Sequence, residues 1–169
     1  HFADHENGRR KIISFHGAGT VFPGYRQHDY KIELSLITAA LSNMKVLEFT
    51  KDQFQKMFET NIALSEQVVN WNSMYINRFL FEIVHQEYNP SFVKICNLLY
   101  LLTINQPACS GLVIDMTQEE LAEILGLSRI QLTRGLSELR RQNIISTSRG
   151  KIHVINLPAL ASLCSSETI

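Results

Sequence analysis

The sequence has few of the features that mark secreted, membrane-bound or metal-binding proteins. Only three of its 169 residues are cysteine, four are proline and one is tryptophan. No apolar run reaches the roughly 20 residues that a membrane-spanning helix requires, and no signal-peptide pattern opens the chain. The odd number and wide spacing of Cys96, Cys109 and Cys164 favour free thiols over disulfides or a metal site. These absences predict a cytoplasmic protein that does not enter a membrane.

The chain also lacks an excess of charge of either sign. Its 16 basic residues balance 16 acidic ones, which excludes a uniformly basic protein that coats nucleic acid. Apolar residues make up 45% of the chain and charged residues 19%, values typical of one large or two small globular domains. The first residue is His1 rather than Met and stands in strand-like sequence, so we expect a fragment of a longer protein.

The clearest positive signal is a helix-turn-helix pattern in residues 117–142, TQEELAEILGLSRIQLTRGLSELRRQ. Its first four residues have the spacing of a capping box, which predicts a helix from Gln118. Gly126 stands where a left-handed residue ends a helix, and Ser128 can cap a second helix that begins at Arg129. A helical hairpin in an ordinary all-α core is the alternative.

The second predicted helix has an apolar face, formed by Leu132, Leu136 and Leu139, and an exposed polar face. A helix with an arginine-bearing first turn can enter the major groove and place side chains against base edges. Phosphate contacts position such a helix, whereas base contacts specify the sequence. We assign guanine or phosphate contact to Arg129 and Arg134, base discrimination to Ile130 and Gln131, a place on the same face to Thr133, and phosphate contact to Thr117, Ser128, Arg149 and Lys151.

A small β-sheet is predicted around the motif. Residues 143–148 and 151–155 read as two strands joined by a tight turn, and residues 112–115 as a third. The hairpin would be the wing of a winged helix, with its basic tip near the phosphates. Residues 128–151 carry six basic side chains against one acidic side chain, Glu138. This local positive charge is typical of a DNA-binding surface.

A long helix is predicted from Asn61 to Glu87, a stretch without glycine or proline. Its apolar residues recur every seven positions, which favours a dimer seam. Packing of the helix against its own β-rich front is the alternative, and both can hold for different faces. We interpret Trp71, Tyr75 and Phe79 as core or interface residues before a ligand site. The predicted seam consists of Ile62, Val69, Ile76 and Ile83.

The remaining segments are read more coarsely. Residues 1–50 look β-rich, with strands predicted at 2–4, 10–15, 32–40 and 45–49. A capping box at Thr50 then predicts a short helix to Phe58. Asn89-Pro90-Ser91 breaks the long helix as a hinge, and a further apolar helix is predicted from Phe92 to Thr103.

Taken together, the chain resembles the cyclic AMP receptor protein / fumarate-nitrate reduction regulator (Crp/Fnr) family of bacterial transcription factors. The resemblance is specific at TQEEL (117–121), GLSR (126–129) and QNIIS (142–146). It is looser at GRRKIISF (8–15), which resembles a β-roll hairpin of the family's sensor domain.

The resemblance implies an α+β fold in three parts. They are a partial β-roll, cyclic-nucleotide-binding-like sensor domain at 1–58, a dimerisation helix at 59–88, and a C-terminal winged helix-turn-helix DNA-binding domain at 89–169. It also implies a homodimer that binds double-stranded DNA at a near-palindromic operator, contacts RNA polymerase and responds to a small-molecule effector.

The sequence departs from the family in the sensor part. Members that bind a cyclic nucleotide carry a Gly-Glu pair and a downstream Arg-Ser/Thr-Ala. Here Gly24 precedes Tyr25-Arg26, and the stretch 31–36 reads KIELSL, where Glu33 would repel a phosphate. Cyclic AMP is therefore not the expected ligand, and the effector and any cofactor stay unidentified. The family's iron–sulfur cysteines would lie upstream of this sequence, and haem ligation by His16 or His28 is an open alternative.

A second departure lies in the reading helix. The family often carries a glutamate that accepts a hydrogen bond from cytosine, where this chain has Ile130, which can only contact a thymine methyl group. Gly135 stands where a buried aliphatic residue is usual. We predict a dimeric, effector-responsive, sequence-specific DNA-binding regulator, with a ligand-binding sensor module that acts through protein contacts as the alternative. No nucleophile–base pair, paired carboxylates or phosphate loop indicates an enzyme.

Overall fold

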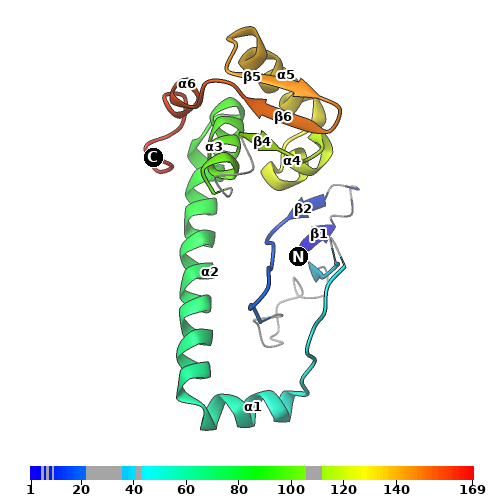
Figure 1. The fold of residues 1–169 in the computed structure, drawn as a ribbon, viewed down its shortest axis with the longest axis vertical. Helices are drawn as coiled ribbons and strands as arrows, with labels where there is room; N and C mark the ends of the chain where they lie inside the picture. Colours follow the sequence, from blue (N-terminus) through cyan, green and yellow to red (C-terminus); the bar gives the residue numbers. More distant parts are fainter. Residues whose placement is uncertain (5, 7, 9, 22–35, 41–42, 106–111) are drawn as a thin grey trace.

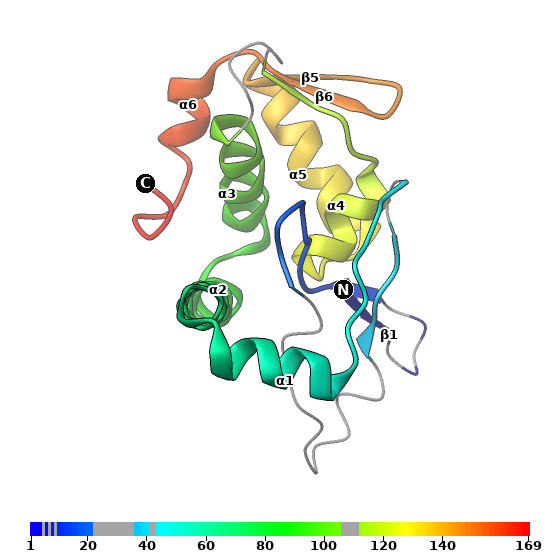
Figure 2. The same cartoon turned by 60° about the horizontal axis from the view of Figure 1, so that its bottom comes forward.

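The computed structural model describes residues 1–4, 6, 8, 10–21, 36–40, 43–105 and 112–169 (Figure 1). Its helices and small sheets form the predicted α+β fold. A long helix runs from a short helix at one end to a compact helical and β unit at the other, and the N-terminal strands lie beside it (Figures 1 and 2). Within the described residues, no helix is both long and apolar enough to span a membrane.

The N-terminal half contains one small sheet and two helices. The sheet is antiparallel with the order β2-β1-β3, and β1 pairs with β2 from Phe2↔Ile12 to Asp4↔Arg10. The elements are β1 (Phe2–Asp4), β2 (Arg10–Ile12), β3 (Leu36–Ile37), α1 (Lys51–Thr60) and α2 (Ile62–Tyr88).

The C-terminal half is a winged helix-turn-helix. Its sheet has the order β4-β6-β5, with all neighbours antiparallel. The elements are α3 (Ser91–Ile104), β4 (Val113–Ile114), α4 (Gln118–Leu125), α5 (Arg129–Arg141), β5 (Ile145–Ser148), β6 (Lys151–Val154) and α6 (Leu157–Ala161).

The long helix begins and ends within one residue of its predicted bounds, Asn61 and Glu87. The Asn61 side chain caps its N-terminus by accepting from the Leu64 amide at 3.1 Å. Asn89 and Pro90 end it, because the residue before a proline disfavours the helical conformation. At about 1.5 Å per residue, its 27 residues span about 40 Å.

Three strand predictions for the N-terminal half were wrong or too long. Residues 45–49 are not a strand, because the exposed segment 43–50 has no neighbouring chain to pair with in the described part of the structure. The predicted strand 10–15 ends at Ile12. Of the segment 32–40, only Leu36–Ile37 is strand among the described residues.

The first wing strand also starts later than predicted. Asn143 adopts a left-handed conformation with φ of 56°, and the Ile144 amide donates to the Leu139 carbonyl at 3.0 Å. These residues therefore end α5 rather than begin the strand at 143, and the strand proper begins at Ile145.

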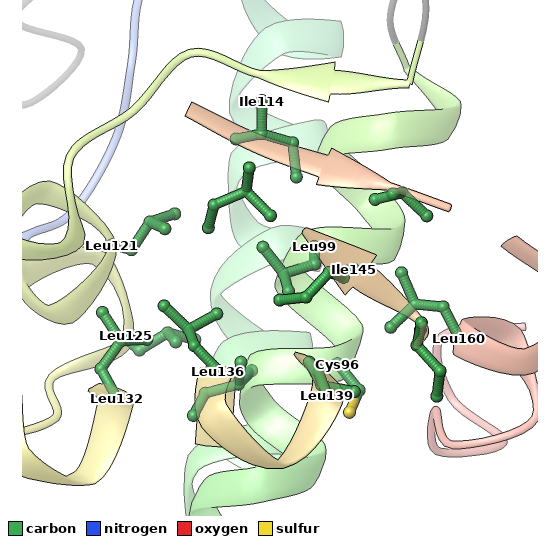
Figure 3. Packing of buried hydrophobic residues seen from close by; sticks show 14 of the residues in the cluster. Cys96, Leu99, Ile114, Leu121, Leu125, Leu132, Leu136, Leu139, Ile145 and Leu160 are labelled. Atoms are coloured by element: carbon green, nitrogen blue, oxygen red, sulfur yellow. The ribbon is translucent and has the colours of Figure 1, made fainter. Parts of the chain in front are cut away.

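The hydrophobic core lies in the C-terminal half. Every apolar side chain that is buried in the described residues lies between Ile95 and Leu160. Side chains from α3, α4, α5, α6 and the wing converge there (Figure 3). The predicted inward residues of α5, Leu132, Leu136 and Leu139, are fully buried. This core positions α5 on one side and leaves its other side in solvent.

Gly135 explains how closely α5 approaches α3. A Cβ at this position would lie 2.4 Å from Ile95 Cδ1, well inside van der Waals contact. Ile95 is itself 1% exposed and therefore has little room to rotate away. The glycine that stands in place of the usual aliphatic residue thus permits close packing of the two helices.

Gly135→Ala should destabilise the protein despite the better helix propensity of alanine. Overpacking costs about 1–3 kcal/mol, against about 1 kcal/mol gained in propensity. Combining it with Ile95→Val removes the clashing Cδ1, so the double variant should be more stable to urea than Gly135→Ala alone. If the changes in the free energy of unfolding of the two single variants simply add in the double variant, the two side chains do not clash.

Candidate nucleic-acid interface

Both helices of the helix-turn-helix are held at their N-termini by reciprocal capping boxes. In α4, the Glu120 amide donates to Thr117 Oγ1 at 3.2 Å, and the Thr117 amide donates to Glu120 Oε2 at 2.7 Å. In α5, the Gln131 amide donates to Ser128 Oγ at 3.3 Å, and the Ser128 amide donates to Gln131 Oε1 at 2.9 Å. The start of α5 is therefore fixed in register, as the sequence predicts.

The turn between the helices has the left-handed glycine that the sequence predicts. Gly126 has φ of 66°, and its amide and that of Leu127 both donate to the Ala122 carbonyl. A residue with a Cβ is strained in this conformation. The turn directs the chain straight into the Ser128 cap of α5.

Several side chains that are predicted to contact DNA form hydrogen bonds within the protein. Gln131 Oε1 accepts from the amide and the hydroxyl of Ser128, and Gln131 Nε2 donates to Ser91 Oγ at 3.4 Å. Thr133 Oγ1 donates to Gln118 Oε1 at 3.2 Å. A base contact by Gln131 stays a prediction and requires its side chain to leave these partners.

Four side chains of α5 line a shallow, open depression on the exposed face: Arg129, Ile130, Thr133 and Arg134. Ile130 is 66% exposed, although large aliphatic side chains are usually buried. In the described part of the chain, neither Arg129 nor Arg134 forms a salt bridge or a hydrogen bond through its side chain. The face thus presents unpaired guanidinium groups beside an exposed methyl-bearing side chain.

The wing has a basic tip, formed by Arg149 and Lys151. Ser148 pairs with Lys151, and Gly150 with φ of 71° closes the turn after Arg149. The Arg149 side chain is unpaired within the described residues, whereas Lys151 Nζ lies 3.8 Å from Asp115 Oδ2. Figure 1 shows the β5–β6 hairpin on the same unit as α5, as expected for a wing.

Not every arginine of this region is available. Arg141 forms a bidentate pair with Glu138 at 2.6 and 2.9 Å, and these hydrogen bonds lower the pKa of Glu138 to about 2. The carboxylate is ionised at neutral pH and neutralises Arg141. Arg140 donates to Thr147 and Ser137, which ties α5 to the wing. The three-residue spacing of Glu138 and Arg141 on one helix favours their pair, whereas no local pattern predicts the contact of Arg140 with the wing.

The predicted dimer seam is exposed in the single chain. Its members Ile62, Val69, Ile76 and Ile83 are 76%, 55%, 58% and 64% exposed. Trp71 and Tyr75, by contrast, are partly covered, and Tyr75 Oη lies 2.9 Å from His16 Nδ1. The helix therefore has one face toward its own N-terminal half and an apolar face left in solvent.

In the N-terminal half, His16 has two close polar neighbours. His16 contacts Ser14 Oγ at 3.0 Å as well as Tyr75, and burial lowers the pKa of its imidazole. No group of three or more candidate metal ligands occurs in the described residues. His28 and the stretch 24–35, including Glu33, lie outside the described residues.

Comparison with known proteins agrees with this geometry. Residues 93–163 match the family of Crp-like helix-turn-helix domains. No curated protein matches the chain. The chain thus carries a Crp-like helix-turn-helix domain.

Solved structures extend the likeness over the rest of the chain. FixK2 from Bradyrhizobium japonicum has a TM-score of 0.70 at 15% identity, with 98% of this chain and 82% of FixK2 covered. The c-di-GMP-responsive global regulator CLP from Xanthomonas campestris has a TM-score of 0.67 at 14% identity, covering 90% and 78%. A CooA variant from Carboxydothermus hydrogenoformans has a TM-score of 0.61 at 17% identity, covering 68% and 55%. The chain thus spans about half the length of the CooA variant. Together with the domain match, this fold confirms the resemblance to the Crp/Fnr family.

Proposed function

We propose that the chain is a transcription regulator that binds double-stranded DNA by inserting α5 into the major groove. One observation carries the proposal. The unpaired Arg129 and Arg134 lie on the exposed face of α5. A capping box holds the N-terminus of this helix, and its other face is buried in a Crp-like helix-turn-helix domain. Guanidinium groups so placed can donate two hydrogen bonds to a guanine or pair with a phosphate.

The other candidate residues divide by their position. Ile130 and Gln131 lie at the N-terminal end of α5, where side chains meet base edges, and Thr133 lies one turn further. The caps at Thr117 and Ser128 place backbone N–H groups and hydroxyls at helix N-termini, which favour phosphate. Arg149 and Lys151 would contact the phosphates flanking the groove.

We further propose that two chains associate through α2. A two-fold dimer would present its reading helices about 34 Å apart, one turn of DNA, and would require a near-palindromic operator. The division into a sensor part (1–58), a dimerisation helix (59–88) and a DNA-binding domain (89–169) belongs to this proposal. So do a cytoplasmic location, contact with RNA polymerase and a small-molecule effector other than cyclic AMP.

Titration of salt during duplex binding tests the proposal. Release of counterions makes the logarithm of the binding constant fall with the logarithm of salt, with a slope of about −0.9 per phosphate neutralised. We expect a slope corresponding to several phosphates per dimer. Absence of duplex binding even at low salt would favour the alternative, a sensor module that acts through protein contacts.

Ile130→Glu should change the preferred base at one position of each half-site. Isoleucine offers no acceptor and favours a thymine methyl, whereas glutamate can accept from cytosine N4. A good hydrogen-bonded pair is worth about 1–3 kcal/mol of discrimination. Selection from a randomised half-site, run on both proteins and on Ile130→Leu as the apolar control, measures the change. If the unchanged protein already selects cytosine as strongly as the glutamate variant, another side chain reads this position.

A further inference from the structure

The C-terminal end of α4 is completed by side chains from outside its own domain. The last carbonyls of a helix have no partners within it and favour a nearby positive charge. The turn satisfies the Ala122 carbonyl, but α4 has no basic residue in its last turn. The carbonyls of Ile124 and Leu125 therefore depend on other elements.

Lys11 of β2 and Gln86 of α2 supply these partners. Lys11 Nζ donates to the Ile124 carbonyl at 2.5 Å, across 113 residues of sequence. Gln86 Nε2 donates to the Leu125 carbonyl at 3.1 Å. An ammonium group from the N-terminal sheet thus occupies the negative end of the α4 dipole.

Two further side chains fix these donors. Glu82 Oε1 accepts from Lys11 Nζ at 2.7 Å and from Gln86 Nε2 at 2.9 Å. Lys94, at the start of α3, donates to the Gln86 carbonyl at 2.7 Å and to its side-chain oxygen at 2.9 Å. The four residues, called here the Lys11 cluster, connect β2, α2 and α3 to α4.

The cluster is charged at neutral pH. Burial by itself would raise the pKa of Glu82, but hydrogen bonds from Lys11 and Gln86 bring that pKa below its usual range. The carboxylate is therefore ionised at neutral pH, where it pairs with the Lys11 ammonium group.

The position of this contact bears on the reading helix. Gly126 and Leu127 are the only residues between the anchored carbonyls and the Ser128 cap of α5. A Cβ on Gly126 would lie 3.8 Å from Lys11 Cδ, so the lysine stem runs along the turn itself. β2 also packs against α4 (Figure 1). A shift of β2 would consequently displace the turn that aims α5.

We infer that Lys11 is a positioning residue for DNA binding, which fixes the orientation of α4 and α5 relative to α2 from within the N-terminal sheet. The inference deepens the proposed function and rests on it. In the orientation that the cluster holds, Arg129 and Arg134 face solvent without partners. Lys11 therefore stabilises the binding-competent arrangement, and its loss lets α4 and α5 move about the hinge at Asn89-Pro90.

The test compares Lys11→Met with Lys11→Arg, which keeps the charge and the donor. Lys56→Met, an exposed change of the same charge in α1, is the control for net charge. When a smaller fraction of the protein has the binding-competent arrangement, its apparent affinity for DNA falls in proportion. The duplex affinity of Lys11→Met should therefore be at least about fivefold lower than that of the unaltered protein. Lys11→Arg should restore most of the affinity, and Lys56→Met should leave it unchanged.

A distance measurement separates this inference from the proposed function. Spin labels on unnatural amino acids at the exposed Asn70 of α2, which lies off the proposed seam, and Ser146 of β5 report the interdomain orientation without DNA. Dilution with unlabelled chain leaves one labelled protomer per dimer. Lys11→Met should broaden or shift the distance distribution with unchanged thermal unfolding, and Lys11→Arg should not.

An unchanged distribution, or duplex affinity that is unchanged or tighter in Lys11→Met, would overturn the inference even if the unaltered protein binds DNA. If the unaltered protein binds no duplex, the proposed function fails while the distances still decide the role of Lys11 in positioning.

Discussion

Replacing Val69 and Ile76 together with aspartate should convert the protein to monomers and abolish tight operator binding. Both side chains lie on the exposed apolar face of α2, 55% and 58% exposed in the single chain. Unpaired carboxylates in a dimer seam would have to lose their hydration, which is costly. A monomer reads one half-site only, so specific affinity should fall toward the non-specific level, by about a thousandfold. Sedimentation and duplex titration measure the two effects.

The neighbouring asparagines provide a matched control. Asn70→Asp with Asn77→Asp adds the same two charges to exposed positions one residue further along the same helix. This variant should remain dimeric and bind duplex normally, apart from a small electrostatic loss. If the Val69→Asp, Ile76→Asp protein folds normally and stays dimeric, the seam lies on another surface.

Arg134→Ala should cause the largest loss of duplex binding of any single substitution on α5. A lost arginine contact to guanine costs about 1–3 kcal/mol, and a two-fold dimer loses two of them, about 2–6 kcal/mol per operator. If the partner is a phosphate, the salt slope should also become shallower by about 0.9 per lost contact. If the partner of Arg134 is a guanine, the salt slope should not change, and the preference for that guanine over other bases should weaken.

Arg141→Ala is the appropriate comparison on the same helix. It removes the same charge, but Arg141 is already paired with Glu138, whose pKa that pair lowers to about 2. Its replacement should weaken duplex binding far less than that of Arg134. Equal losses in the two variants would mean that only net charge matters. Unchanged binding in Arg134→Ala would remove this residue from the interface.

The parts of this protein that the sequence predicts well are those determined over a few residues. A capping box spans four positions, and the turn at Gly126 depends on one residue's tolerance of positive φ. The pattern of leucines in α5 likewise reflects the period of a single helix. The winged helix-turn-helix and the long α2 could therefore be inferred before any tertiary contact was known.

The strand predictions failed where hydrogen-bonding partners from another segment decide whether a strand forms. Residues 45–49 have the composition of a strand, but a strand requires a partner that the described part of the chain does not supply. Asn143 belongs to the end of α5 because the α5 carbonyls accept its neighbours' amides. Propensity indicates what a segment can form, and the available partners decide what it does form.

Tertiary structure alone decided which residues of the site are free and what orients them. The three-residue spacing of Glu138 and Arg141 favours their pair, but nothing in the local pattern shows that Arg140 donates to Thr147 of the wing or that Gly135 makes room for Ile95. The contact between Lys11 and the end of α4 joins residues 113 positions apart. Local spacing determined the helices and their caps, because backbone hydrogen bonds within a helix are short-range. The packing of separate elements determined charge pairing and orientation, because these depend on which side chains meet in space.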